Sequence, residues 1–328
     1  MKIIVIGCGS IGKRHAKNLN FLGIKDIVLC DPIQSKLISL GKIIRTSLLY
    51  KDFKEALREN PDISVAIICT PTAFHMEPAI YLAKRKINLF IEKPLSNNLK
   101  KTKLLSKIAS SKKITVMMGH SYMFEDGFLK LKSLLDKNVI GKLYYATYFQ
   151  GQYLPDWHPK EDYKIEYTAS KSLGGGALLT LTSHTFYLIE WLFGRIKSID
   201  GYLIGKIGSL EVDVDDSVFL LMKTERGVIV QTQNNFIVKV HNHKLIVEGI
   251  KGRLEFDFVE KKILLLLNNH KPKLVHTNKD NNERFLKEMK FFLKKLKQKN
   301  LEKNLNLESG IRFLQKIKPL QKKAFFIS

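Results

Sequence analysis

The chain begins Met1-Lys-Ile-Ile-Val-Ile-Gly7-Cys-Gly9-Ser-Ile-Gly12, in which an apolar strand runs into a G-x-G-x-x-G turn. Gly7 lets the chain turn sharply off the strand, Gly9 lets the backbone approach a pyrophosphate, and Gly12 lets the following helix pack closely on the sheet. The N-terminus of that helix carries unpaired N–H groups, which bind phosphates. Together these features predict a dinucleotide-binding site at the start of the chain.

An acid follows at the place where such a site needs one. Residues 27–31 read Ile-Val-Leu-Cys-Asp31, a second strand that ends in a carboxylate. A carboxylate there accepts hydrogen bonds from the 2′-hydroxyl of an adenosine ribose, and its charge repels a 2′-phosphate. No arginine directly follows Asp31 to offset that repulsion. We therefore predict NAD as the cofactor, rather than NADP.

Strands and helices go on alternating as far as residue 120, which is the pattern of a doubly wound parallel sheet, the Rossmann arrangement. The sequence predicts helices over residues 53–58, 73–86 and 99–110 and strands over 65–69, 89–92 and 114–118. A helix over 126–137, a strand over 142–150 and strand-like runs from 198 to 267 indicate a mostly antiparallel sheet. We expect an α/β protein with a dinucleotide-binding domain at 1–120 and an α+β substrate-binding domain at 121–328.

The composition is that of a globular chain without membrane segments. A chain of 328 residues, 45% hydrophobic, can bury a sizeable core. Neither the first residues nor the longest apolar run, residues 263–267, suits a signal peptide or a membrane span. Cys8, Cys30 and Cys69 fit no disulfide framework and are expected to be small buried side chains. We therefore expect a cytoplasmic protein.

The net charge of +24 favours anionic ligands, but the lysines are spread along the chain. The densest stretch, residues 283–299, places apolar and lysine residues at helical spacing and predicts an amphipathic surface helix. We expect no nucleic-acid partner and no membrane partner. The charge instead favours phosphorylated or nucleotide-linked substrates, with a lysine-rich coding bias as the alternative.

Two further motifs follow strands, at the edge of a doubly wound sheet where ligands bind. In Thr70-Pro71-Thr72-Ala-Phe-His75, Thr72 is expected to cap the next helix and His75 to lie in its first turn, facing the cofactor. A capped helix with a surface histidine is the alternative. In Glu92-Lys93-Pro94, the lysine can orient a substrate hydroxyl and stabilise a developing alkoxide. A solvated lysine beside a proline turn is the alternative there.

These motifs, in this order and spacing, resemble the glucose-fructose oxidoreductase/inositol dehydrogenase/rhizopine-catabolism (Gfo/Idh/MocA) family. The resemblance covers most of the chain and includes Gly174-Gly-Gly176-Ala-Leu-Leu-Thr180-Leu-Thr-Ser-His184. This stretch is similar to the family's glycine-rich start of a helix that bears an aspartate and, four residues on, the catalytic histidine. The resemblance implies NAD(P)-dependent chemistry at a hydroxyl carbon of a sugar, sugar nucleotide or cyclitol. It also implies a second domain with a large open sheet, which roofs the active site and forms a dimer or tetramer interface.

Carried over by position, Lys93 and His184 are the catalytic pair. Thr180 and His184 are four residues apart on one helix face, so both can point into one cleft. A histidine, with an ordinary pKa of about 6.5, suits a group that takes a hydroxyl proton as hydride leaves. Without the resemblance, His184 would be interpreted as a core histidine.

Two positions depart from the family pattern. Thr180 stands where the family usually has aspartate, and Met123 stands where an arginine is common. The first change removes a charge, although a threonine hydroxyl can still orient a histidine or meet a substrate hydroxyl. The departures leave two interpretations. The chain is either a variant enzyme with a weaker proton relay through the histidine, or a protein that is losing its catalytic activity.

Residues 151–176 form a long polar and aromatic segment. Within it, residues 153–163, followed by Lys171 just before the glycines, resemble a subset of the family found with surface-glycan and nonulosonate sugar pathways. Tyr163, Tyr167 and Lys171 are expected over the cleft, where a ring stacks on a sugar or base and a cation meets a phosphate or carboxylate. The alternative is that Trp157 and the tyrosines only hold the loop against the sheet. His241 and His243 alternate along a strand without an evident third ligand, so we expect no metal.

The predicted function is NAD-dependent hydride transfer between nicotinamide and a secondary hydroxyl carbon of a sugar, sugar phosphate or nucleotide sugar, in surface-glycan sugar biosynthesis. The alternatives are an inositol or free-sugar dehydrogenase in catabolism and a non-catalytic NAD-binding sensor. The expected assembly is a homodimer or homotetramer. Expected substrate contacts are Tyr163, Lys171, Thr180 and His184. Expected cofactor contacts are Gly7, Gly9, Ser10, Ile11, Gly12, Asp31, Thr70, Pro71, Thr72, His75, Glu92 and Lys93.

Overall fold

The chain divides into two units, and the structure, a computed structural model, describes residues 1–298, 305–321, 323 and 325–326. The first unit holds Met1–Ser121 and Asn282–Leu314. The second unit holds Tyr122–Asn281 and Gln315–Ser328. A segment from late in the chain therefore completes the first unit.

A sheet of six parallel strands forms the centre of the first unit, in the order β3-β2-β1-β4-β5-β6. The strands are β1 (Lys2–Ile6), β2 (Ile27–Cys30), β3 (Leu49–Tyr50), β4 (Ile63–Ile68), β5 (Asn88–Ile91) and β6 (Val116–Met118). Most of their side chains are buried, because helices cover both faces. The predicted doubly wound sheet is confirmed, although the two-residue strand β3 was not predicted.

The helices of the first unit pack on both faces of this sheet. They are α1 (Ser10–Phe21), α2 (Gln34–Ile44), α3 (Phe53–Glu59), α4 (Met76–Lys84), α5 (Leu99–Lys112), α8 (Glu283–Gln298) and the start of α9 (Leu307–Gln321). On one face, Ile4 of β1 shares a buried core with Leu82 of α4 and Leu105 of α5. On the other face, Phe90 of β5 meets Phe292 of α8 edge to face, with 5.4 Å between ring centres.

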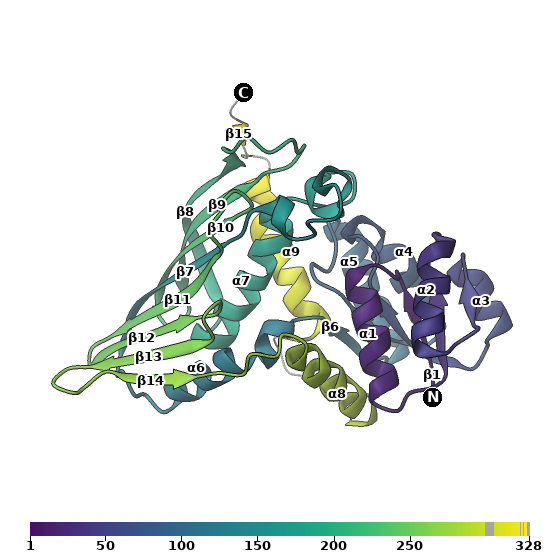
Figure 1. Ribbon diagram of the computed structural model, residues 1–328, viewed down its shortest axis with the longest axis horizontal. Coiled ribbons are helices and arrows are strands. Elements are labelled where there is room, and N and C mark those ends of the chain that lie inside the picture. Colours follow the sequence, from purple (N-terminus) through teal and green to yellow (C-terminus); the bar gives the residue numbers. More distant parts are fainter. Residues whose placement is uncertain (299–304, 322, 324, 327–328) are drawn as a thin grey trace. The chain divides into compact units, whose positions relative to one another are not determined.

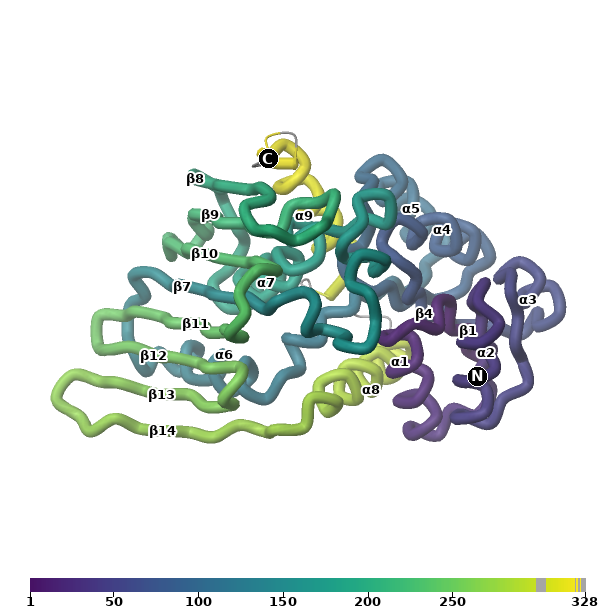
Figure 2. The backbone as a smooth tube through the Cα atoms, turned by 45° about the horizontal axis from the view of Figure 1, so that its top comes forward, coloured from purple at the N-terminus to yellow at the C-terminus, as the bar shows by residue number. Residues whose placement is uncertain are grey.

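The late helix α8 lies beside α1 in the first unit (Figure 2). The side-chain amide of Asn282 donates to Oδ1 of Asn18 over 2.9 Å, across 264 residues of sequence. α8 buries Phe285, Met289 and Phe292, while most of its lysines stay on the exposed side. The predicted amphipathic helix is confirmed over its described part, and Lys299 lies outside the described residues.

Among the described residues, nine strands form the sheet of the second unit, in the order β14-β13-β12-β11-β7-β10-β9-β8-β15. They are β7 (Leu143–Gly151), β8 (Ile196–Lys206), β9 (Ser217–Thr224), β10 (Ile229–Asn235), β11 (Asn242–Gly249), β12 (Gly252–Asp257), β13 (Lys262–Leu267), β14 (Lys273–His276) and β15 (Phe325–Phe326). β10 pairs in parallel with β7, and β15 with β8, while the other pairings are antiparallel. The predicted mostly antiparallel sheet is confirmed.

Two helices cover one face of this second sheet. α7 (Ala177–Phe193) packs on β8, β9 and β10, and α6 (Asp126–Asp136) packs on β12 and β13 (Figure 1). Because side chains alternate along a strand, the intervening residues point to the opposite face. Tyr145, Leu203, Leu221 and Ile229 are exposed there.

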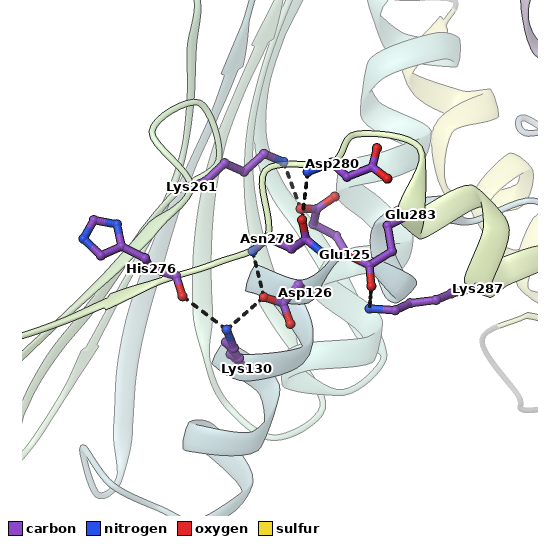
Figure 3. A network of polar contacts seen from close by, with 9 residues as sticks. All are labelled: Glu125, Asp126, Lys130, Lys261, His276, Asn278, Asp280, Glu283 and Lys287. Atoms are coloured by element: carbon purple, nitrogen blue, oxygen red, sulfur yellow. Dashed lines mark hydrogen bonds and ion pairs between the residues drawn. The ribbon is translucent and has the colours of Figure 1, made fainter.

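Polar contacts attach the start of α6 to the end of the sheet (Figure 3). Nζ of Lys261 lies 2.9 Å from Oε1 of Glu125, and both side chains are buried. Asp126 accepts from the backbone N–H of Asn278 at 2.9 Å and pairs with Lys130 at the same distance. A buried charge pair of this kind fixes α6, because removing either partner would leave the other charge unpaired.

One local prediction was wrong. Thr72 does not cap the following helix, because residues 72–74 form a 3-10 turn, and α4 begins only at Met76 with His75 as its N-cap residue. The hydroxyl of Thr72 makes no capping hydrogen bond in this turn. The extra turn starts where Pro71 holds the backbone φ at −55°, which suits the start of a turn.

Candidate active site

The glycine turn after β1 has the geometry that a dinucleotide requires. Gly7 has φ +93°, and a Cβ there would lie 2.6 Å from the carbonyl carbon of Cys69. A Cβ on Gly12 would lie 1.8 Å from the carbonyl oxygen of Gly7, so neither glycine admits a side chain. Gly9 differs, since among the described residues no atom beyond the adjoining chain lies within 4 Å of its Cβ position. The open space beside Gly9 fits the close approach of a pyrophosphate.

The N-terminus of α1 fits the same ligand. Gly9 is the N-cap residue of α1 and offers no side-chain cap, and the first turn holds no acidic residue. The first hydrogen bond of the helix runs from Lys13 N to Gly9 O over 2.9 Å. The N–H groups of Ser10 and Ile11 therefore have no partner within the helix and are placed to meet an anion.

Asp31 closes the glycine turn from the end of β2. Its Oδ2 accepts from the N–H of Cys8 at 2.7 Å, and its Oδ1 accepts from the N–H of Ile33 at 2.9 Å. A carboxylate has further lone pairs, so Asp31 can also accept from ribose hydroxyls. Burial, together with the charge of Asp31, raises the pKa of Cys8 to about 12. Cys8 is thus a neutral buried thiol, and Cys30 and Cys69 are likewise buried and free, as predicted.

His75 is a buried clamp between two strand ends and not a surface histidine. Its Nε2 lies 2.8 Å from the carbonyl oxygen of Thr70, and its Nδ1 lies 3.0 Å from that of Pro94. Burial lowers the pKa of His75, so the ring is neutral and donates to only one of the two oxygens at a time. The clamp fixes the segments that follow β4 and β5.

Lys93 is the second residue after β5, at the carboxyl edge of the sheet, where the glycine turn also lies. Burial lowers the pKa of Lys93 to about 8, and the charge of Glu92 opposes that shift. A lysine with a pKa this close to neutrality can donate a hydrogen bond to a bound oxygen as an ammonium group, and it can also lose that proton. The arrangement suits the stabilisation of a developing alkoxide.

Glu92 belongs to a buried polar cluster on the face covered by α1 and α8. Its Oε1 lies 2.6 Å from Nε2 of His15 in α1. Burial alone would raise the pKa of Glu92, but the bond to His15 and the charges of His15 and Lys93 outweigh burial and leave the pKa lowered. Glu92 is therefore the charged carboxylate of the cluster.

A second acid, Glu288 of α8, completes this cluster. Its Oε1 accepts from the backbone N–H of His120 at 2.5 Å, and its side chain is fully buried. Burial and the charge of Glu92 raise the pKa of Glu288 well above its ordinary value, so Glu288 is protonated. Burial and the charge of Lys93 lower the pKa of His120 to about 3, which makes that ring neutral.

His184 lies on α7, in the second unit. The helix is described in full, and only His184 and Trp191 along it keep partial exposure. Thr180 is buried and donates its hydroxyl proton to the carbonyl oxygen of Gly176 over 2.7 Å. The helix backbone thus uses the proton of Thr180. Met123 is also buried, and its side chain carries no charge.

The start of α7 explains the glycine triplet. Gly176 has φ +97°, and a Cβ there would lie 2.6 Å from Oδ1 of Asp215. Oδ2 of Asp215 accepts from the N–H of Leu178 at 2.6 Å, so this carboxylate caps the helix. Burial raises the pKa of Asp215 to about 6.

The loop between β7 and α7 is fastened to the second unit. Trp157 packs edge to face on Phe236, with 5.4 Å between ring centres. The hydroxyl of Tyr163 accepts from the N–H of Glu211 at 3.2 Å. The N–H of Lys171 donates to Asp213 at 2.7 Å, while its side chain is exposed. Trp157 and Tyr163 therefore do pin the loop, and the ammonium group of Lys171 remains exposed to solvent.

One group of metal-ligating side chains occurs in the described part of the chain, in this loop. Donor atoms of His158, Glu161 and Glu166 lie within 4.8 Å of one another. The ion pair between His158 and Glu166, at 2.5 Å, accounts for most of this grouping. His243 is buried with Nε2 2.6 Å from the hydroxyl of Tyr148, whereas His241 precedes β11 and is exposed.

The sequence reasoning missed His15, Glu288 and Tyr122, which the structure places beside predicted site residues. His15 stands three residues after Gly12, one turn into α1. Glu288 occupies an apolar position of α8, between Phe285 and Phe292, and an acid in an apolar stripe is a signal that could have found it. Tyr122 carried no local signal.

Family comparisons agree with this geometry. Residues 1–120 match the family described as "Oxidoreductase family, NAD-binding Rossmann fold", and residues 128–255 match "GFO/IDH/MocA C-terminal domain". The chain is 28% identical to myo-inositol 2-dehydrogenase of Thermotoga maritima over 312 residues, which covers 90% of this chain and 88% of that protein.

Solved structures share the fold. A levoglucosan dehydrogenase in complex with NADH and levoglucosan has a TM-score of 0.86 at 17% identity, covering 98% of this chain and 97% of that one. UDP-N-acetylglucosamine 3-dehydrogenase of Acidithiobacillus ferrooxidans has a TM-score of 0.79 at 15% identity, covering 99% and 97%. The family matches, which span most of both units, confirm the predicted resemblance. The chain therefore belongs to the GFO/IDH/MocA family and is an NAD-binding oxidoreductase of the sugar and polyol class.

Proposed function

We propose that this protein transfers hydride between NAD and a secondary hydroxyl carbon of a sugar-type substrate, with His184 moving the proton and Lys93 holding the oxygen. The observation that carries the proposal is the place of Lys93. It follows β5 at the carboxyl edge of the first unit's sheet, the edge that also holds the glycine turn and Asp31. Ligands of doubly wound sheets bind at that edge.

The residues proposed to hold the cofactor surround the glycine turn. The backbone at Gly9 and the N–H groups of Ser10 and Ile11 would meet the pyrophosphate, and Asp31 would accept from the adenosine ribose. The remaining proposed contacts are Gly7, Gly12, Thr70, Pro71, Thr72, His75, Glu92 and Lys93. NAD, when bound, supplies the hydride acceptor in the oxidation direction.

The two catalytic side chains divide the remaining work. His184 would take the proton of the substrate hydroxyl during oxidation and return it during reduction, for which an ordinary histidine pKa of about 6.5 is suited. Lys93 is a cation below its pKa of about 8 and would donate a hydrogen bond to the substrate oxygen. Charge that develops on that oxygen is thereby stabilised.

For the substrate, we propose a sugar, sugar phosphate or nucleotide sugar in surface-glycan sugar biosynthesis, contacted by Tyr163, Lys171 and Thr180. The net charge of +24 and the exposed Lys171 side chain support an anionic substrate. The similarity to myo-inositol 2-dehydrogenase supports the alternative, an inositol or free-sugar dehydrogenase in catabolism.

For the assembly, we propose a homodimer or homotetramer that associates through the open face of the second sheet. Tyr145, Leu203, Leu221 and Ile229 give that face an apolar character, and an exposed apolar patch of this kind commonly marks an interaction site. No helix among the described residues is long and apolar enough to span a membrane. Three free cysteines support a reducing compartment, and we propose the cytoplasm.

A substrate panel tests this function. Purified protein and NAD⁺ are incubated with free sugars, cyclitols, sugar phosphates and nucleotide sugars, and reduced nicotinamide is followed by its absorbance. Turnover confined to phosphorylated or nucleotide-linked members supports the biosynthetic proposal, and turnover on inositol or free sugars supports the alternative. Protein that binds NADH and turns over no member would contradict the proposal and favour a non-catalytic sensor.

A further inference from the structure

The ring of Tyr122 stacks on the imidazole of His184. Their ring centres are 4.4 Å apart, and the two planes are inclined by only 23°. Tyr122 lies in a short 3-10 turn (Ser121–Phe124), whereas His184 lies in the middle of α7. Both residues are in the second unit. A face-to-face contact at this distance fixes the plane of the imidazole on one side.

Hydrogen bonds from the second sheet hold the Tyr122 ring in turn. Nε2 of Gln150 donates to the hydroxyl of Tyr122 at 3.1 Å. The hydroxyl of Tyr148 donates to Oε1 of Gln150 at 3.3 Å and lies 2.6 Å from Nε2 of His243. Gln150, Tyr148 and His243 are all buried, so this chain of hydrogen bonds is fixed to β7 and β11. The stacked ring is therefore anchored at its far end.

The stacked ring also supplies negative potential for a protonated His184, which Thr180 does not supply. A carboxylate four residues before a catalytic histidine would stabilise the imidazolium that forms when the histidine takes a proton. Thr180 carries no charge, and its proton is donated to Gly176. The face of an aromatic ring bears partial negative charge and attracts a cation that lies over it within about 6 Å. The Tyr122 ring meets that condition for a protonated His184.

We propose that Tyr122 is a positioning residue for His184, which sets the plane of the imidazole and stabilises its protonated form in place of the missing carboxylate. The inference rests on the proposed role of His184 as the proton carrier. The groups that face Tyr122 from the packed elements are His184, His243, Gln150, Phe128 and Phe258. None of these five groups is a carboxylate, and the face of the Tyr122 ring lies against the imidazole.

The kinetic test compares Tyr122→Leu with Tyr122→Phe, and uses Tyr144→Leu, an exposed tyrosine of β7, as the matched control. We expect Tyr122→Leu to lower kcat about 10-fold and to change KM less than about 3-fold, since both the cation–π contact and the ring that fixes the imidazole plane are lost. In the oxidation direction, the acid limb of the pH profile of kcat should move to lower pH by about half a unit in Tyr122→Leu, because the imidazolium of His184 is less stabilised. Tyr122→Phe keeps the ring and should restore most of kcat.

A spectroscopic test needs no activity. In protein with ¹³C-labelled histidine, the ring face of Tyr122 should shift the His184 imidazole proton signals upfield, and His184→Asn assigns them by their disappearance. The shift should persist in Tyr122→Phe and Tyr144→Leu and vanish in Tyr122→Leu. If Tyr122→Leu fails to fold, Gln150→Leu, which removes the hydrogen bond from Gln150 to the Tyr122 hydroxyl, should reduce the shift and lower kcat.

The outcomes separate the two proposals. Wild-type protein that turns over no substrate overturns the function, while the histidine signals still report on the stack. If the wild type is active, the positioning role is overturned by a Tyr122→Leu variant that keeps the wild-type kcat and pH profile. It is also overturned by a Tyr122→Leu variant whose His184 signals lie where they do in the wild type. Loss of kcat and of the upfield shift together, restored by Tyr122→Phe, supports it.

Discussion

Nε2 of His15 lies 2.6 Å from Oε1 of Glu92, and both side chains are buried. His15 stands on α1, the helix whose N-terminus fits the dinucleotide phosphates, and Glu92 directly precedes Lys93. One buried contact therefore joins the proposed phosphate site to the proposed catalytic lysine. The geometry of Lys93 depends on a helix that the cofactor itself would contact.

Removing one partner of this contact should be costly. His15→Leu leaves the buried Glu92 carboxylate without its 2.6 Å partner, so we expect the free energy of unfolding to fall by about 3–5 kcal/mol. The double variant His15→Leu/Glu92→Leu should lose less than the single variant, because it also removes the buried carboxylate that has lost its hydrogen-bond partner. Urea denaturation of the three proteins measures this, and a double variant less stable than the single one would contradict it.

The glycine turn predicts a separation of binding from folding. Gly9→Val should leave the melting temperature unchanged and raise the Kd for NADH by at least about 10-fold, because its side chain would occupy the space open to the pyrophosphate. Gly12→Val should instead unfold the first unit, since a Cβ there meets Gly7 O at 1.8 Å. Calorimetric titration and thermal melting distinguish them, and Gly9→Val with normal NADH affinity would refute the assignment.

Asp31 should set the preference between the two dinucleotides. In Asp31→Asn, the negative charge that repels a 2′-phosphate is gone, while the amide oxygen can still accept from the Cys8 or Ile33 N–H. We expect the ratio of the NADPH and NADH dissociation constants to fall by about 10-fold or more, as one lost charge contact predicts. Fluorescence titration with both reduced cofactors measures the ratio, and an unchanged ratio counts against Asp31.

Lys93 should titrate near pH 8. Its pKa is lowered by burial to about 8, so the ammonium is present below that pH and is lost as pH rises through it. We expect kcat/KM to decline above about pH 8 for this reason. Lys93→Ala should lower kcat by about 10²–10⁴ and remove this limb. A wild-type profile that stays flat to about pH 10 would be inconsistent with a lysine of lowered pKa.

The sequence predicted the architecture well where physical requirements are local. The glycine turn, the acid at Asp31 and the apolar strands each follow from spacing along a few residues, and the structure has the predicted sheets. The return of α8 to lie on α1 has no local signal, because its apolar stripe shows only that it packs on something. The contact between Asn18 and Asn282 depends on tertiary packing, since it joins residues 264 apart in the sequence.

The candidate site was predictable only in part, for the same reason. Lys93 and His184 could be proposed as catalytic residues because a motif fixes their place in the chain. The partners of these residues, such as His15 and Tyr122, depend on which elements pack together. Thr72 was assigned as a cap from residue type alone, and the 3-10 turn after Pro71 overrode that preference.

Hydride transfer itself is the most direct test of the account. A substrate identified from the panel is prepared with deuterium on the carbon that bears the reacting hydroxyl, and the reduced cofactor is analysed by mass spectrometry and NMR. We predict one deuterium at C4 of the nicotinamide with the wild type, and formation of that product slowed by about 10²–10⁴ in His184→Ala. Reduced cofactor that carries no deuterium from this carbon, or equal rates in wild type and His184→Ala, would contradict the account.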